Sequence, residues 1–159
     1  MSVLVQSAAF DPGAELNAFA SGSAQAGAVA MFTGLVRDLN LGQQVQAMQL
    51  EHYPGMTEQA LADIAAAAAA RWSLIAARVI HRHGELLPGE PIVAVLCAAA
   101  HRGDAFAACE CIMDRLKTEA PFWKREHTPA GARWVDARDS DERAARRWDA
   151  AAGQDDEHG

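Results

Sequence analysis

Hydrophobic positions in the first half of the chain follow first a strand-like and then a helical spacing. Short apolar or alternating runs predict strands over residues 28–37 and 45–53, with a polar loop between them. Apolar residues then recur at helical spacing from Met56 to Trp72, which predicts a helix over residues 56–72. Residues 1–26 are weakly patterned, and a short helix is the most that we expect there.

The second half of the chain predicts a similar mixture of strands and helices. A nearly continuous apolar run over residues 91–99 predicts a central strand that is covered on both faces. Asp104 is the expected N-cap of the next helix, and Pro121 cannot continue that helix. The other elements predicted here are a strand over 76–83, a helix over 105–118, a strand over 132–138 after a loop, and a short helix from Asp139 to Trp148.

Strands and helices in this order predict an α+β fold, in which helices pack on a mostly antiparallel sheet. The sequence contains neither an internal repeat nor a linker long enough to separate two domains. We therefore expect one domain over residues 1–148, followed by a disordered acidic tail over residues 149–159.

The formal net charge of −7 argues against a nucleic-acid-binding protein, which needs a basic surface. Much of this excess lies in residues 139–159, so an anion-binding site is compatible with the rest of the chain. No apolar run reaches the roughly 18–20 residues of a membrane span, and no secretory leader is visible. The cysteines are odd in number and form no C-x-x-C pair. We therefore expect a cytoplasmic protein without a metal, a cofactor, a nucleic-acid partner or a membrane partner.

Polar side chains with chemical potential form three clusters in this alanine-rich sequence. Each cluster lies at or just beyond the end of a predicted strand or helix, where side chains can line a site. The clusters are Arg37 with Asp38 and Asn40; His101 with Arg102; and Lys117 with Lys124, Arg125 and Glu126.

His101 and Arg102 stand between the buried strand and the N-terminus of the next helix. Free N–H groups and the positive end of the helix dipole attract anions at such a place. A guanidinium there can bind a phosphate through two hydrogen bonds. An ordinary solvated strand end is the alternative.

Lys117 lies about 60° from the centre of the apolar face of its predicted helix, at the edge of the buried surface. Its aliphatic stem could cover apolar surface while the amine stays in water. Alternatively, partial burial lowers the pKa of the amine and makes a neutral lysine available. Lys124 follows two aromatic residues that would hold its loop in place. A solvated Lys-Arg-Glu run is the alternative for that segment.

Other candidate sites are weaker. His81 and His83 alternate along a predicted strand but lack a third metal ligand, so ordinary polar positions are favoured. Cys97 and Cys109 are expected to be core residues, and Cys111 has no evident base that would activate it as a nucleophile.

Five segments of the chain, taken in order, resemble the family of molybdopterin synthase large subunits. The resemblance covers about residues 27–148, and LEHYPGMTE and LKTEAPFWKRE are its most specific parts. The segments are TGLVRDLNLG, LEHYPGMTEQAL, VIHRHGELLPGE, AAAHRGDAFAACECIMDRLKTEAPFWKRE and RWVDAR.

The resemblance implies an α/β hammerhead-type domain with a small β subdomain, and a homodimer of large subunits. One small ubiquitin-like subunit binds at each outer end and completes a heterotetramer. The C-terminal Gly-Gly of this partner carries a thiocarboxylate that donates sulfur. Two transfers convert cyclic pyranopterin monophosphate to molybdopterin, so the implied activity is that of a sulfurtransferase of molybdenum cofactor biosynthesis.

The resemblance also implies the site residues. Lys117 corresponds to the main catalytic lysine of the family and Lys124 to a second one. His101 and Arg102 would serve either the site of their own chain or that of the neighbouring protomer. Leu35, Gly103-Asp104 and His83 depart from the family pattern, which alters the charge near the phosphate without removing a catalytic position. The implied substrate-binding residues are Leu35, Val36, Arg37, His101, Arg102, Lys117, Lys124, Arg125 and Glu126.

Two other functions remain open from the residues alone. One is a module that docks a ubiquitin-like tail without performing chemistry, although such a module has no need of both lysines. The other is a phosphoryl-transfer or pterin-hydrolysing enzyme, which ordinarily needs a metal cluster or a carboxylate pair that the sequence does not offer.

Overall fold

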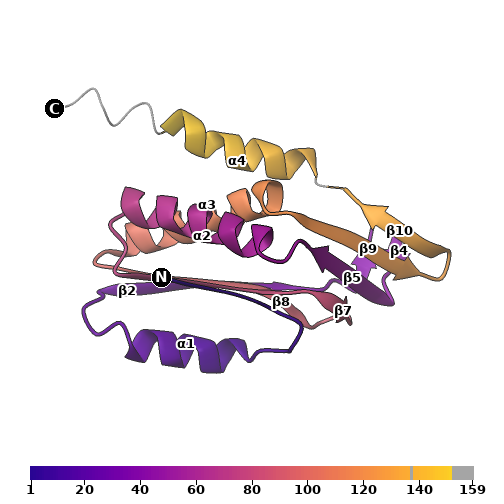
Figure 1. Ribbon diagram of the computed structural model, residues 1–159, viewed down its shortest axis with the longest axis horizontal. Helices are drawn as coiled ribbons and strands as arrows, with labels where there is room; N and C mark the ends of the chain where they lie inside the picture. Colours follow the sequence, from indigo (N-terminus) through magenta and orange to yellow (C-terminus); the bar gives the residue numbers. More distant parts are fainter. Residues whose placement is uncertain (137, 152–159) are drawn as a thin grey trace.

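The computed structural model describes residues 1–136 and 138–151 of the 159-residue chain (Figure 1). Its strands and helices confirm the predicted α+β class, with helices packed on mostly antiparallel sheets. The first half of the chain forms β1 (Ser2–Gln6), α1 (Pro12–Ser21), β2 (Ala28–Leu35), β3 (Leu39–Asn40), β4 (Gln43–Gln44), β5 (Ala47–His52) and α2 (Met56–Arg71). The second half forms β6 (Ala76–Arg82), β7 (Gly84–Leu86), β8 (Pro91–Ala99), α3 (Arg102–Glu119), β9 (Phe122–Thr128), β10 (Gly131–Val135) and α4 (Asp139–Ala151).

The main sheet has the strand order β1-β6-β8-β2, with a parallel β1–β6 pair and antiparallel pairs beyond it. Helices α2 and α3 cover one face, and α1 lies on the other (Figure 1). Strand β8 is central, and every residue from Val93 to Ala99 is buried, as its apolar run predicts. Strand β2 forms an edge of the sheet, so one side of its backbone is open to pairing with a further strand.

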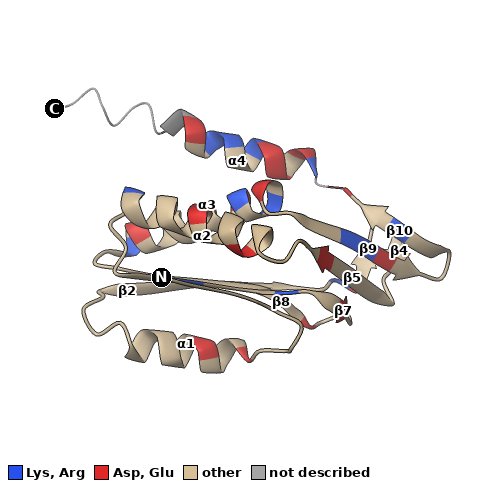
Figure 2. Ribbon diagram, viewed as in Figure 1, with Lys and Arg blue, Asp and Glu red and all other residues tan. Residues whose placement is uncertain are grey.

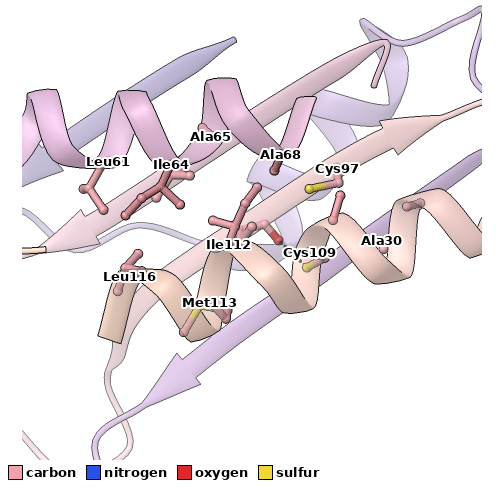
Figure 3. Close-up of a cluster of buried hydrophobic side chains, with 14 of the residues drawn as sticks. Ala30, Leu61, Ile64, Ala65, Ala68, Cys97, Cys109, Ile112, Met113 and Leu116 are labelled. Carbon is pink, nitrogen blue, oxygen red and sulfur yellow. Dashed lines mark hydrogen bonds between the residues drawn. The ribbon is translucent and has the colours of Figure 1, made fainter. Parts of the chain in front are cut away.

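The core between α2, α3 and the main sheet combines large and very small side chains (Figure 3). Leu61 and Ile112 are completely buried at its centre. Ala65 and Ala68, which belong to a run of six alanines over residues 65–70, also face this core. Small side chains let the helices approach closely, so the alanine run contributes to packing as well as to helix propensity.

The second sheet, with the order β10-β9-β5-β7, is antiparallel throughout and forms the small β subdomain. One face carries the buried side chains of Met48 and Leu50 on β5, and Leu86 on β7 is paired with Met48. Met48 is paired across the strands with Glu126, and Leu50 is paired with Lys124. Because directly opposite residues point to the same face, β9 directs Lys124 and Glu126 to this inner side.

Two strands of five residues or more form where the sequence pattern predicts none, in addition to the short strands β3, β4 and β7. Residues 2–6 form β1, because they gain a parallel partner in β6, a long-range contact that leaves no local signal. Residues 122–128 form β9 rather than a loop, and the strand predicted over 132–138 is its hairpin partner β10, which ends at Val135. The inner face of β9 is charged because it borders a polar site, so the usual alternation of apolar and polar residues is hidden.

The prediction that Asp104 caps α3 is wrong. The helix begins at Arg102, with His101 as its N-cap, and the His101 side chain makes no capping hydrogen bond. The backbone carbonyl of His101 accepts the first helical bond from Ala105. Asp104 instead lies in the first turn, where its negative charge interacts favourably with the positive end of the helix dipole and so stabilises the helix.

Helix α4 continues to Ala151 instead of ending at Trp148, so residues 149–151 of the expected tail are helical. Residues 152–159 lie outside the described part of the chain. Trp148 packs edge-to-face on Trp72 and donates a hydrogen bond of 2.8 Å to Asp114 of α3. Charges of both signs follow one another along α4 (Figure 2), and Arg147 pairs with Asp114 at 2.7 Å. These contacts fix α4 on α3.

His81, one of the two histidines considered as metal ligands, belongs to the packed interior instead. It is 5% exposed, and its ring stacks on Phe122 with 3.8 Å between the ring centroids. Burial lowers the pKa of this imidazole from 6.5 to about 4. The unfolded chain therefore binds a proton at a higher pH than the folded protein does. Folding stability should fall as the pH drops from 6.5 to about 4.

Replacing His81 with Phe should remove this sensitivity to acid while keeping an aromatic ring against Phe122. On going from pH 8 to pH 5, the wild-type protein should lose about 2 kcal/mol of unfolding free energy through His81 alone. His81→Phe should be spared that loss. Urea denaturation of both proteins at the two pH values measures the difference, and equal losses would contradict the assignment.

Candidate active site

Lys117 and Lys124 are the only lysines in a chain that has twelve arginines. Lys117 lies in the last turn of α3, and its side chain is 49% exposed. Its Nζ is 3.5 Å from Oδ1 of Asp141, a residue in the first turn of α4. The exposure favours the interpretation in which the Lys117 amine stays in water while its stem covers apolar surface.

Lys124 lies on β9, shortly after the chain turns at Ala120 and Pro121, and it is less exposed than Lys117. Burial lowers the pKa of the Lys124 amine, and the positive charge of Lys117 lowers it further. The charge of Arg138 acts in the same direction. Partial burial is one of two alternatives that the sequence leaves open for Lys117, whereas the fold provides a partly desolvated amine at Lys124. The two lysines are therefore suited to different roles.

Glu126 is 3% exposed and is the centre of a hydrogen-bond network. Its carboxylate accepts hydrogen bonds from Asn40 Nδ2 at 2.8 Å and from Arg133 Nη2 at 3.0 Å. The other end of the Asn40 amide, Oδ1, accepts a hydrogen bond of 2.8 Å from Arg138 Nη2. Glu126 therefore holds the β3–β4 hairpin and β10 against β9, and its contact with a substrate stays a prediction.

Arg125 lies on the opposite face of β9 from Lys124, because successive strand residues point to opposite sides. Its guanidinium carbon is 5.4 Å from the centre of the Trp134 ring. This outer face also has a shallow hollow of about 330 Å³ lined by Tyr53, Trp123 and Trp134, with Glu51 and His52. Arg125 is therefore separated from the lysines within one chain, and its role in substrate binding stays a prediction.

Leu35, Val36 and Arg37 stand where β2 ends. Val36 is buried, and its N–H and C=O groups bond to Glu90 O at 3.0 Å and to Gly89 N at 2.8 Å. Leu35 and Arg37 are exposed on either side of it. Since Asn40 further along the same loop is bonded to Glu126, the loop that carries Arg37 is attached to β9.

His101 and Arg102 are exposed at the start of α3, far from the lysines. Lys117 follows Arg102 by fifteen positions along α3, which corresponds to about 22 Å along the helix axis. One chain therefore does not bring the proposed phosphate-binding pair and the two lysines into a single site.

An open groove of about 390 Å³ runs between β2 and α3 and ends at Lys117. Phe32 and Phe106 line it with much of their surface exposed. The groove lies beside the open edge of β2, and its remaining lining is Ala30, Met31, Cys109, Glu110, Met113 and Asp114.

A sequence profile described as MoaE protein matches residues 5–119 of the chain. The chain is 62% identical over 147 residues to the molybdopterin synthase catalytic subunit of Ralstonia nicotianae. That match covers 92% of this chain and 84% of the relative. The chain belongs to the MoaE family.

Solved structures support the MoaE fold. A molybdopterin biosynthesis MoaE protein from Burkholderia ambifaria matches with a TM-score of 0.79 and 54% identity, over 93% of this chain and 97% of that one. A complex of subunits 1 and 2 of molybdopterin-converting factor from Helicobacter pylori matches with a TM-score of 0.72. It is 19% identical and covers 86% of this chain and 91% of that one, so this second likeness shows the fold alone.

The MoaE chain is an enzyme subunit of the molybdopterin synthase type, with a role in molybdenum cofactor biosynthesis. No helix within residues 1–136 and 138–151 is long and apolar enough to cross a membrane. The same residues contain no group of three or more His, Cys, Asp or Glu side chains that could hold a metal ion.

Proposed function

We propose that this MoaE chain transfers sulfur to cyclic pyranopterin monophosphate and so forms molybdopterin. The sulfur donor is the thiocarboxylated C-terminal Gly-Gly of a small ubiquitin-like subunit. The observation that carries this proposal is that Lys117 lines the end of an apolar groove, with Lys124 close enough for the charge of Lys117 to lower its pKa.

The groove and the adjacent edge of β2 suit an extended peptide tail. A peptide can add to the open backbone edge of β2, while the apolar groove receives its side chains. Glycines at the tail's end permit a close approach to Lys117, because they carry no side chain. The Helicobacter pylori structure of the same fold is itself described as a complex of two subunits.

The two lysines suit the two needs of the reaction. The Lys117 ammonium attracts the anionic thiocarboxylate, whose sulfur forms a bond to a side-chain carbon of the pterin and displaces an oxygen from it. In one round the displaced oxygen is the phosphate ester oxygen, and in the other it is the carbonyl oxygen, which leaves as water. Water then cleaves the bond between sulfur and the acyl carbon, which leaves an ordinary carboxylate on the partner. Two such rounds supply both dithiolene sulfurs and open the cyclic phosphate. The Lys124 amine, with its lowered pKa, can accept and return the protons that these steps move.

The candidate phosphate-binding pair, His101 and Arg102, does not reach the two lysines within one chain. We propose a homodimer in which His101 and Arg102 of one protomer face Lys117 and Lys124 of the other. The separation of about 22 Å along α3 supports this arrangement, because a second copy is needed to bring the two groups together. With a small subunit at each outer end, the assembly is a heterotetramer.

Reconstitution tests the proposed function directly. The purified chain is incubated with cyclic pyranopterin monophosphate and the thiocarboxylated small subunit, and the dithiolene product is measured. We expect product with the thiocarboxylated partner and none with the same partner ending in a carboxylate. Absence of product with the thiocarboxylated partner would refute the proposed activity.

The three cysteines should be dispensable, because sulfur arrives on the partner. Cys97, Cys109 and Cys111 are all buried and free, which fits a reducing compartment such as the cytoplasm. Burial raises the pKa of the Cys111 thiol, which disfavours a reactive thiolate. The triple alanine variant should form product within about a factor of two of wild type. A folded variant without activity would point instead to a persulfide on the chain.

A further inference from the structure

Asn40 belongs to the first polar cluster of the sequence, yet the proposed reaction gives it no role. It is 6% exposed and ends the two-residue strand β3. Leu41 and Gly42 connect β3 to β4, with φ angles of 51° and 74°. A leucine rarely adopts a positive φ, and such a conformation persists only where the surroundings fix it. The strained turn thus places Asn40 in a defined position against β9.

The Asn40 side chain joins two charged groups of opposite sign. Its Nδ2 donates to Glu126 Oε1 at 2.8 Å, and its Oδ1 accepts from Arg138 Nη2 at 2.8 Å. Glu126 itself is fixed on β9, two residues after Lys124 and on the same face. A buried amide with both ends bonded has a single orientation, so Asn40 determines where the Arg138 guanidinium lies.

Arg138 is tied to Lys117 as well as to Lys124. It immediately precedes α4, and its carbonyl accepts a hydrogen bond of 2.8 Å from the N–H of Asp141. The carboxylate of Asp141 is the partner of Lys117, at 3.5 Å. Arg138 therefore connects the surroundings of the two lysines. On one side it bonds to Asp141, the partner of Lys117. On the other side it bonds to Asn40, which is bonded to Glu126 on the same face of β9 as Lys124.

Arg133 and Arg138 differ in how many of their guanidinium N–H groups already make hydrogen bonds within the chain. The Arg133 guanidinium donates to Glu126, to Gln43 Oε1 at 3.3 Å and to the Asn40 carbonyl at 2.9 Å. Within the described part of the chain, Arg138 makes one side-chain hydrogen bond, through Nη2, and is otherwise exposed. Arg133 is held in the network, whereas most N–H groups of Arg138 remain available to an anion.

We infer that Arg138 is a further anion-binding residue of the active site, and that Asn40 is the residue that positions it. The inference deepens the proposed function, because it adds a guanidinium for an oxyanion to the site of the two lysines. The oxyanion is a phosphate of the substrate or the terminal group of the partner's tail. Both are bound by the same chemistry, in which a planar guanidinium donates paired hydrogen bonds.

The variants that test this inference are Arg138→Gln, Asn40→Ala and the double variant. Arg138→Gln removes the charge and keeps a donor for Asn40. Arg143→Gln is the matched control, because it removes one exposed positive charge from the neighbouring helix α4. Far-UV circular dichroism and thermal unfolding establish which variants are folded, and Arg138→Gln keeps the test valid if the buried Asn40→Ala change unfolds the protein.

The first readout is binding of inorganic phosphate, measured by calorimetry without any reaction. Arg138→Gln and Asn40→Ala should each weaken phosphate binding about tenfold, and the double variant should be no weaker than Arg138→Gln. Arg143→Gln should bind as wild type does. Phosphate binding that is equal in wild type and Arg138→Gln overturns the inference, whether or not the protein makes product.

The second readout separates the two sources of the oxyanion. If Arg138 binds the pterin phosphate, KM for cyclic pyranopterin monophosphate rises about tenfold in Arg138→Gln while kcat stays near the wild-type value. If it binds the tail, the Kd of the thiocarboxylated partner rises instead. An effect on kcat alone contradicts a binding role. Wild-type protein that binds phosphate through Arg138 but makes no product would refute the proposed function and leave this inference standing.

Discussion

Lys117→Ala should lower molybdopterin formation at least about a hundredfold, because a cation that meets the incoming thiocarboxylate is lost at the end of the groove. Lys117 is half exposed and its amine contacts Asp141 at 3.5 Å, so its removal should leave the fold intact. Lys117→Arg keeps the charge and should retain part of the activity. The measurement is the initial rate of dithiolene formation with one preparation of thiocarboxylated partner.

Lys124 supplies the matched comparison. Lys124→Arg keeps a positive charge but cannot give up a proton at neutral pH, so it should be as inactive as Lys124→Ala. In the wild type, activity should fall as the pH drops through the lowered pKa of Lys124, because protonation removes the neutral amine. Full activity in Lys117→Ala would contradict the site, and strong activity in Lys124→Arg would contradict proton transfer by Lys124.

The parts of the fold that local patterns encode are predicted well. The apolar run 91–99 gives the bounds of β8 and its central position, and helical spacing gives α2 to within one residue. Strands β1 and β9 are missed for different reasons. β1 depends on a distant partner, β6, whereas the charged inner face of β9 hides its alternation behind the chemistry of the site.

The candidate site is predicted in part. The resemblance identifies Lys117 and Lys124, and helical geometry places Lys117 at the edge of a buried face. The lowered pKa at Lys124 depends on burial that only the folded β9 creates, and the sequence offers a lowered pKa only for Lys117, as one of two alternatives. Asp141 and Arg138 reach the site through packing of α4 on α3, which no local pattern encodes.

A mixed dimer should recover activity that both parent variants lack, if each site is built from two protomers. In the arrangement proposed here, Lys117 of one protomer works with Arg102 of the other. A dimer of one Lys117→Ala protomer and one Arg102→Ala protomer then contains one doubly defective site and one site with both residues intact. Each parent homodimer carries one defect in every site.

The direct test is to co-express the two variants with different affinity tags, purify the mixed dimer through both tags, and measure its rate with thiocarboxylated partner. Substrate is kept below KM, so that loss of phosphate binding in the Arg102→Ala homodimer is visible as a lower rate. A shared site predicts about half of the wild-type rate per dimer, far above either parent. A mixed dimer no more active than its parents, or an Arg102→Ala homodimer as active as wild type, would contradict the shared site.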